Sequence, residues 1–204
     1  MLFYDQYQTI SEISQGVFKD RGSKFLAFAF PFTNESALKE ILQTLKTEHT
    51  KANHFCYAYR LTPDRFVFRV NDDGEPAGTA GRPILNVLLS KEITNVLIVV
   101  VRYFGGTLLG VPGLINAYKS AAEDVIAQSN IIEKTVQDIY EISFEYPQMN
   151  DVMKLIKDEN LTNFDQDFDL SCKIKIAVNQ AKVNRIMDKL GDILAIKTKF
   201  LYTQ

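Results

Sequence analysis

The chain has 204 residues, of which 46% are hydrophobic and 24% are charged, and its formal net charge at pH 7 is −2. This length allows one large or two small domains, and the near-neutral charge excludes binding to nucleic acid by bulk electrostatic attraction. The two cysteines, Cys56 and Cys172, form neither a metal-binding spacing nor a disulfide framework, so we expect a reducing, cytoplasmic environment. The N-terminus lacks the basic and apolar segments of a signal peptide, and the longest apolar run, residues 96–101, is too short to span a bilayer.

In the first half, hydrophobic residues alternate between the two-residue period of strands and the longer period of helices. Strands are expected at residues 9–17, 24–30, 55–61, 66–70 and 96–101. Helices are expected at residues 34–49, at residues 82–90, and from the end of a glycine-rich loop, residues 104–113, to about residue 128. The strand at residues 96–101 is apolar on both faces, which predicts a central position in a sheet covered on both sides.

The second half predicts the order β-α-β-β-α-β of a ferredoxin-like unit. The expected elements are a strand at 139–146, a helix after Pro147, two strands within 161–178, a helix ending at Gly191, and a strand at 193–202. We place the boundary near residues 131–137, so the predicted domains are residues 1–134 and 138–204. The whole chain is therefore expected to be of the α+β class.

Seven of the ten glycines lie within forty residues: Gly74, Gly78, Gly81, Gly105, Gly106, Gly110 and Gly113. Glycine loses more conformational entropy on folding than other residues, so this crowding indicates tight turns or the close approach of a ligand to the backbone. The loop at residues 104–113 follows a buried strand and precedes a helix, whose first N–H groups are unpaired and attract anions.

Cations near these loops suggest a phosphate-binding surface, because arginine can bind phosphate with two hydrogen bonds. The candidate residues for binding nucleic acid or another anion are Arg82, Arg102, Gly105, Gly106, Gly110, Gly113 and Lys119. No nucleotide-binding motif is matched, however. An architectural role, with turn-forming glycines and an arginine in a structural ion pair, is the alternative.

Three carboxylates, Asp72, Asp73 and Glu75, lie within four residues in the first glycine loop. Their oxygen atoms could hold Mg²⁺ beside a phosphate site. They could instead pair with Arg82 and Arg102 or form an Asp-Gly turn, and the turn with ion pairs is the favoured interpretation.

Residues 54–59 form a strand with two distinct faces. His54 and Cys56 share one face, but no orienting group for a nucleophilic pair is evident, which favours a half-buried histidine and a core cysteine. The aromatic residues Phe55, Tyr57 and Tyr59 share the other face. They could stack on bases, but strand aromatics at this period more often belong to a core.

Residues 72–85, residues 99–110 and the continuation through Gly113-Leu114 to Ala117-Tyr118 closely resemble the signature of the Impact/YigZ family. The resemblance also covers residues 53–56. It implies an N-terminal Impact domain of the ribosomal-protein type, with a left-handed β-α-β crossover. It further implies a C-terminal domain similar to a ferredoxin-like module of elongation factor G.

The resemblance implies a translation-associated regulatory protein, because eukaryotic relatives act in translational control through the starvation-responsive initiation-factor kinase. They have an additional N-terminal partner-binding domain that is not seen in this sequence, so we do not expect the role in the kinase pathway to transfer to this chain. We therefore expect a non-enzymatic protein that binds RNA, a ribosomal surface or a translation factor, and no membrane. The alternatives are a Mg-dependent enzyme or binding protein for a small phosphorylated ligand, and a protein–protein adaptor. Pro112 departs from the family pattern and removes one N–H from the second loop.

Overall fold

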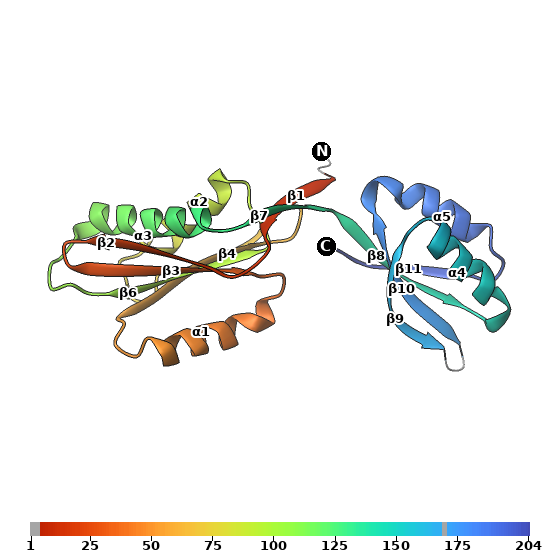
Figure 1. Cartoon of the computed structure of the whole chain (residues 1–204), viewed down its shortest axis with the longest axis horizontal. Coiled ribbons are helices and arrows are strands. Elements are labelled where there is room, and N and C mark those ends of the chain that lie inside the picture. The colour runs from red at the N-terminus through yellow and green to blue at the C-terminus, as the bar shows by residue number, and fades with distance from the viewer. Residues whose placement is uncertain (1–4, 169–170) are drawn as a thin grey trace. The chain divides into compact units, whose positions relative to one another are not determined.

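The computed structural model describes residues 5–168 and 171–204, which form two compact units, each combining helices with a sheet (Figure 1). One unit is Tyr7–Lys134, and the other is Thr135–Gln204 with the segment that ends at Gln6. The chain is of the α+β class, as predicted. None of the helices among these described residues is long and apolar enough to cross a bilayer.

The first unit is built on a five-stranded sheet in which every pair of neighbours is antiparallel. In spatial order its strands are β2 (Ser14–Asp20), β3 (Ser23–Pro31), β6 (Val96–Tyr103), β4 (His54–Leu61) and β5 (Val67–Asn71). Because β3 and β4 both run antiparallel to β6, they are parallel to each other, and the connection between them is a β-α-β crossover. The left hand of this crossover, which the family resemblance implies, stays a prediction.

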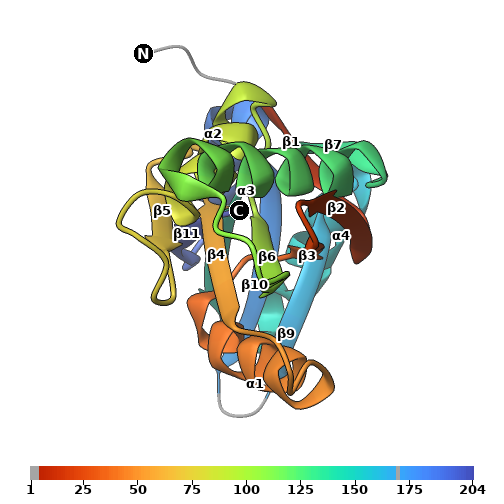
Figure 2. The ribbon, with the colours of Figure 1, turned by 90° about the vertical axis from the view of Figure 1, so that its left-hand side faces the viewer.

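Helices cover both faces of this sheet (Figures 1 and 2). One face carries the 3₁₀ turn η1 (Glu35–Ala37) and α1 (Leu38–Glu48), and Asn34 caps this segment through its side chain. The other face carries α2 (Gly81–Ser90) and α3 (Gly110–Ala127). The apolar run of β6 is fully buried between the two layers, which confirms the predicted central strand.

A separate two-stranded sheet joins β1 (Gln6–Ile10) to β7 (Ile131–Thr135). The predicted strand at residues 9–17 is therefore wrong, because the chain leaves β1 after Ile10 and starts β2 only at Ser14. The Ser11 backbone N–H donates to the Asn130 carbonyl oxygen at 3.0 Å, which directs β1 toward β7 instead of the large sheet. The expected boundary at residues 131–137 contains β7, and the chain passes from one compact unit to the other between Lys134 and Thr135.

The second unit has the predicted β-α-β-β-α-β order. Its elements are β8 (Gln137–Phe144), η2 (Tyr146–Gln148), α4 (Met149–Asp158), β9 (Thr162–Phe168), β10 (Cys172–Asn179), η3 (Gln180–Lys182), α5 (Val183–Gly191) and β11 (Lys197–Thr203). The antiparallel sheet has the order β11-β8-β10-β9, which is the ferredoxin-like arrangement. Residues 169–170, between the two predicted strands of 161–178, lie outside the described residues.

Candidate functional site

The two glycine loops meet at one pocket of about 470 Å³ in the first unit. The pocket lies where β4 begins, β6 ends and α3 begins, and its lining includes His54, Glu75, Arg102, Phe104, Leu108 and Val111. The acidic loop and the arginine loop therefore face each other through Glu75 and Arg102, which the sequence alone left undecided.

A buried ion pair forms the polar wall of this pocket. Arg102 Nη1 donates to Glu75 Oε1 at 2.5 Å, and the two residues are only 5% and 9% exposed. The Tyr118 hydroxyl donates to the same oxygen at 2.7 Å, and His54 Nε2 lies 3.9 Å from it. Removing one partner from such a pair leaves a buried charge without compensation, so these groups hold one another in place.

The Arg102 side chain is also held by aromatic rings. Its guanidinium carbon lies 5.4 Å from the ring centroid of Phe25 and 5.6 Å from that of Phe104, within the range of cation–π contacts. Its Nε atom is buried without a hydrogen-bond partner. Arg102 is thus committed to Glu75 and retains one unsatisfied N–H group.

Cys56 belongs to this network but is not a reactive thiol. Its Sγ atom lies 3.0 Å from the Asp72 carbonyl oxygen and 3.3 Å from the Tyr118 hydroxyl, and its single S–H can donate to either of them. Burial raises the pKa of the Cys56 thiol and also the pKa of Tyr118 far above their usual values, so both groups remain protonated. His54 Nδ1 contacts the Asp73 carbonyl oxygen instead of the thiol, which supports the structural interpretation of this cysteine.

The other two carboxylates of the acidic loop bind backbone N–H groups. Asp72 Oδ1 accepts from Ala80 and Gly81 at 3.0 and 2.8 Å, and its Oδ2 accepts from Gly78 at 2.9 Å. Asp72 thereby caps the start of α2, which its own N-cap residue, Ala80, cannot do. Asp73 Oδ2 accepts from Phe55 at 2.6 Å.

Within residues 5–168 and 171–204, no three acidic, histidine or cysteine side chains converge as metal ligands. The carboxylates of Asp72 and Asp73 accept hydrogen bonds from backbone N–H groups, and that of Glu75 accepts them from Arg102 and Tyr118. The geometry therefore favours the ion-pair interpretation of the acidic loop over the Mg²⁺ alternative.

Packing and turns account for the glycines of the second loop. A Cβ atom on Gly105 would lie 1.9 Å from the Gly22 carbonyl carbon, and one on Gly113 would lie 2.9 Å from Leu109 Cβ. Gly106 and Gly110 have φ angles of +87° and +70°, which favour glycine. The backbone can therefore approach its own neighbours closely, whether or not a ligand binds beside it.

The remaining cations of the prediction lie apart from the pocket lining. Arg82 is exposed at the start of α2, and Lys119 forms an exposed pair with Glu123 at 3.6 Å. Of the predicted anion-binding residues, the pocket thus gathers Arg102 and Gly110 but neither of these two side chains.

Two kinds of residue were absent from the predicted site. Tyr118 lies among the buried apolar residues of α3, but a buried tyrosine hydroxyl needs a partner, and here that partner is Glu75. The second kind is apolar: Phe104, Leu108 and Val111 line the pocket and remain 45%, 82% and 51% exposed. These three residues form the exposed apolar rim of the pocket. The only feature of the sequence that could have indicated the rim is the presence of apolar residues within a glycine-rich loop.

The aromatic stripe of β4 belongs to the core. Phe55, Tyr57 and Tyr59 are 8%, 6% and 1% exposed in the hydrophobic cluster beneath α1. Burial and the hydrogen bond to Glu35 raise the pKa of Tyr59 to about 12. These rings are not accessible for stacking on bases, which supports the core interpretation.

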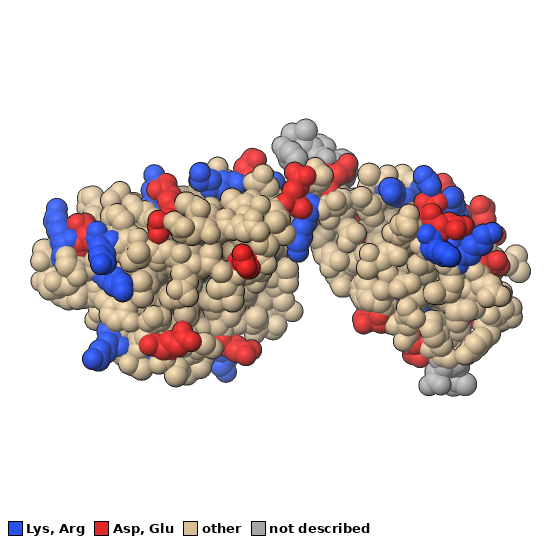
Figure 3. Space-filling view, in the orientation of Figure 1, with Lys and Arg blue, Asp and Glu red and all other residues tan. Residues whose placement is uncertain are grey.

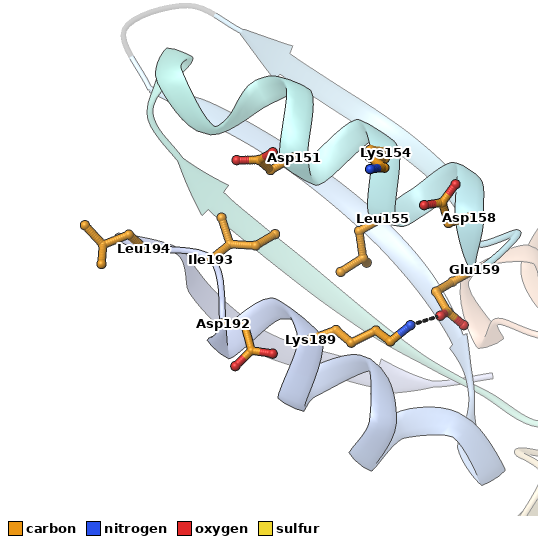
Figure 4. Close-up of a pocket in the computed structure, with 9 residues that line it drawn as sticks. All are labelled: Asp151, Lys154, Leu155, Asp158, Glu159, Lys189, Asp192, Ile193 and Leu194. Atoms are coloured by element: carbon orange, nitrogen blue, oxygen red, sulfur yellow. Dashed lines mark hydrogen bonds and ion pairs between the residues drawn. The ribbon is translucent and has the colours of Figure 1, made fainter.

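A second pocket, of about 440 Å³, lies between α4 and α5 in the second unit (Figure 4). Lys189 pairs with Glu159 beside it, and Arg185 Nη2 donates to both oxygens of Glu159 at 2.7 Å. Hydrogen bonds from Arg185 and Lys189 lower the pKa of Glu159 to about 2. Charges of both signs gather on the surface of the second unit (Figure 3), and the side chains of Arg185 and Lys189 are 62% and 47% exposed, so this pocket is the weaker candidate.

Comparison with known proteins places the first unit in a family. The model of the Impact N-terminal domain matches residues 21–126, which is about half of the chain. The chain belongs to the Impact family. The Impact family member YigZ of Escherichia coli is 31% identical over 172 residues, covering 83% of this chain and 84% of that protein.

Two solved structures extend this comparison. One, described as a hypothetical protein, is 27% identical, covers 98% of this chain and 99% of its own, and superposes with a TM-score of 0.78. Another is described as the two-domain translational regulator Yih1. It is 32% identical, covers 60% of this chain and 47% of its own, and has a TM-score of 0.34. The similarity to the hypothetical protein extends over both units of this chain.

Proposed function

We propose that this Impact-family protein is a cytoplasmic, translation-associated regulatory protein that binds a ribosomal surface through the pocket of its first unit. The broad role follows the family, in which Yih1 is described as a translational regulator. The place of binding rests on one observation, which is the exposed apolar rim around a fixed polar wall. The proposed role is binding and involves no reaction.

The pocket has the features of a docking site for a protruding side chain of a partner. Leu108 is 82% exposed, and Phe104 and Val111 beside it are each about half exposed. Contiguous exposed apolar groups mark interaction sites, and prearranged pockets lose little entropy on binding. The Arg102–Glu75 pair supports this rim from below, since Phe104 stacks on the guanidinium group.

Binding of RNA phosphates through Arg102 is the less favoured version of this proposal. A phosphate would have to displace Glu75 from a buried guanidinium group. Arg82 is exposed and free of such competition, so its contribution would be a salt-dependent contact at the edge of the interface.

The test is co-sedimentation with ribosomes from the same cell across a salt series. We expect the wild type to co-migrate with ribosomes. The Leu108→Asp variant should fail to co-migrate at every salt concentration. Leu194→Asp is the matched control, because Leu194 is 84% exposed but lies in the second unit. Arg82→Ala is expected to co-migrate at low salt and to dissociate earlier than the wild type as salt rises. Wild-type protein that fails to sediment even at low salt, or Leu108→Asp that sediments normally, would contradict the proposal.

A small phosphorylated ligand is the second candidate for the same pocket. The volume of about 470 Å³ lies in the range of small-molecule sites, and Arg102, whose Nε is buried without a hydrogen-bond partner, is one of the lining residues. A ligand that binds only the native state must raise the thermal midpoint. We would therefore screen phosphorylated small molecules by thermal shift, with and without Mg²⁺. A midpoint raised in the wild type but not in Arg102→Met would favour this candidate.

A further inference from the structure

Helices cover the two faces of the five-stranded sheet unequally. Figure 2 shows α2 and α3 together on one face and α1 alone on the other. A helix with its side chains is about 10 Å wide and neighbouring strands lie about 4.8 Å apart, so one helix covers about two strands. The hydrophobic cluster beneath α1 takes its strand residues from β3, β4 and β6. On this face the β2 side chains Gln15, Val17 and Lys19 stay exposed, whereas α3 packs against β2 on the other face.

A groove of about 310 Å³ lies between α1 and the start of β2, where no second helix covers β3. Ile13 stands at its outer side and is 59% exposed, just before β2 begins. Phe28 and Leu45, which are 7% and 3% exposed, form its apolar base. Phe30 and Ile41 complete the apolar lining and are half-buried. The groove is therefore apolar along its length and open to a partner.

The side of the groove formed by α1 carries two acidic side chains. Glu40 and Glu48 line it with Thr44 between them, and this spacing of four residues forms one ridge of the helix. The two glutamates are exposed and lie about 12 Å apart along the helix axis, at 1.5 Å per residue. In the described part of the chain neither forms a salt bridge. Figure 3 shows acidic side chains at the surface where Figure 1 draws α1.

We propose that this groove binds an amphipathic helix of a partner protein, with a basic flank of that helix against Glu40 and Glu48. The bound helix lies beside α1 and covers the part of the face that α1 leaves open. The apolar base accepts its apolar stripe, which is the usual mode of helix-in-groove recognition. The two unpaired carboxylates select lysine or arginine beside that stripe, as flanking charges select partners between packed helices.

The spacing of the two glutamates also specifies the partner sequence. Cations about 12 Å apart on a helix are seven or eight residues apart. Lys19 and Lys24 stand opposite each other near the turn between β2 and β3, outside the groove lining, so the basic part of the bound helix is limited to about two turns opposite α1. This inference does not depend on the proposed ribosome binding, since the groove shares no residue with the pocket of the glycine loops.

Selection from a phage library of helical peptides on the immobilised full chain tests this proposal. Charge varies freely in the library, and clones that also bind Ile13→Asp are removed. Because Ile13 is exposed, this variant should keep the thermal midpoint of the wild type. We expect the remaining clones to carry an apolar stripe flanked by lysine or arginine seven or eight residues apart. Remaining clones without excess positive charge, or no clone that distinguishes the wild type from Ile13→Asp, would overturn the proposal.

Charge reversal is the second test, with a fluorescent peptide of the enriched sequence. We expect Glu40→Lys/Glu48→Lys to bind it about tenfold more weakly than the wild type, because two attractive contacts become repulsive. A matched peptide with glutamate in place of its basic residues should bind this variant better than the wild type.

The matched control is Glu123→Lys/Glu133→Lys, which changes the net charge equally at exposed residues outside the groove lining. It should bind the basic peptide much more tightly than the groove variant does. Equal weakening by the two double variants would show that only the total charge matters, and unchanged binding to Glu40→Lys/Glu48→Lys would show that the glutamates take no part. Either result would overturn the proposal.

Discussion

Glu75 in the first unit and Glu159 in the second each accept hydrogen bonds from two donors, but their surroundings differ. The partners of Glu75, Arg102 and Tyr118, are both buried. The partners of Glu159 are surface cations, since the side chains of Arg185 and Lys189 are 62% and 47% exposed. The two glutamates thus have the same number of donor partners and differ in whether those partners are buried. Comparing them tests the effect of burial alone.

Solvent decides what happens when such a cluster is broken. A surface cation that loses its carboxylate returns to water at little cost, and surface pairs contribute modestly. A buried guanidinium group has no water to return to, and its charge remains uncompensated. We expect the first unit to depend strongly on its ion pair and the second unit to depend on its own only weakly.

The largest expected effect is that of Glu75→Ala. The variant leaves Arg102 buried and unpaired, so we expect the free energy of unfolding of the first unit to fall by about 3–5 kcal/mol. Urea unfolding followed by tyrosine fluorescence would measure it, as the chain has nine tyrosines and no tryptophan. A loss similar to that of Lys189→Ala would contradict the contrast between the two clusters.

A double variant should sharpen this result. Combining Glu75→Leu with Arg102→Met removes both charges together, so we expect it to lose less than the sum of the two single variants, by about 2 kcal/mol. The coupling would be read from the four unfolding curves. Additive losses would mean that the two side chains act independently.

The second cluster should respond to pH. The pKa of Glu159 lies near 2, below its ordinary value of 4.5, so its stabilising contribution is present above about 4.5 and disappears as the pH falls toward 2. We expect the difference in thermal midpoint between wild type and Glu159→Gln to be largest at neutral pH and to shrink through this interval. A difference that does not change with acidification would contradict the assignment.

The smallest expected effect is that of Lys189→Ala. Glu159 keeps both hydrogen bonds from Arg185, and the lost lysine is half exposed, so only a slight lowering of the unfolding midpoint is expected. High salt should abolish the difference from the wild type, because surface charges are screened. A large decrease in the unfolding midpoint that does not depend on salt would contradict this expectation. It would show that the aliphatic part of the Lys189 side chain stabilises the unit through packing.

Local periodicity was sufficient to predict most elements, including the hairpin of β4 and β5, the central β6 and the ferredoxin-like order. It failed for β1 and β7, whose pairing joins residues more than a hundred positions apart and depends on no local pattern. The candidate site shows the same limit. Glu75 and Arg102 were identified as a potential ion pair, but the choice between a metal loop and an ion pair depended on three-dimensional distances.

Tyr118 illustrates why the rest of the site was not predictable. In sequence it is one apolar position among several on α3, and its hydroxyl meets Glu75 only after the sheet has brought the acidic loop over that helix. The exposed rim was equally hidden, because periodicity cannot tell an exposed leucine in a loop, such as Leu108, from a buried one.

The position of β1 has a consequence for the order of events during synthesis. This strand precedes every other described element of the chain, but its partner β7 begins only at Ile131, after the whole five-stranded sheet and α3. At about 5–20 residues per second, the nascent β1 waits roughly 6–24 s before its partner exists. The small sheet is therefore completed late, although Gln8 of β1 can already form its bridge to Ile93 before β7 is made.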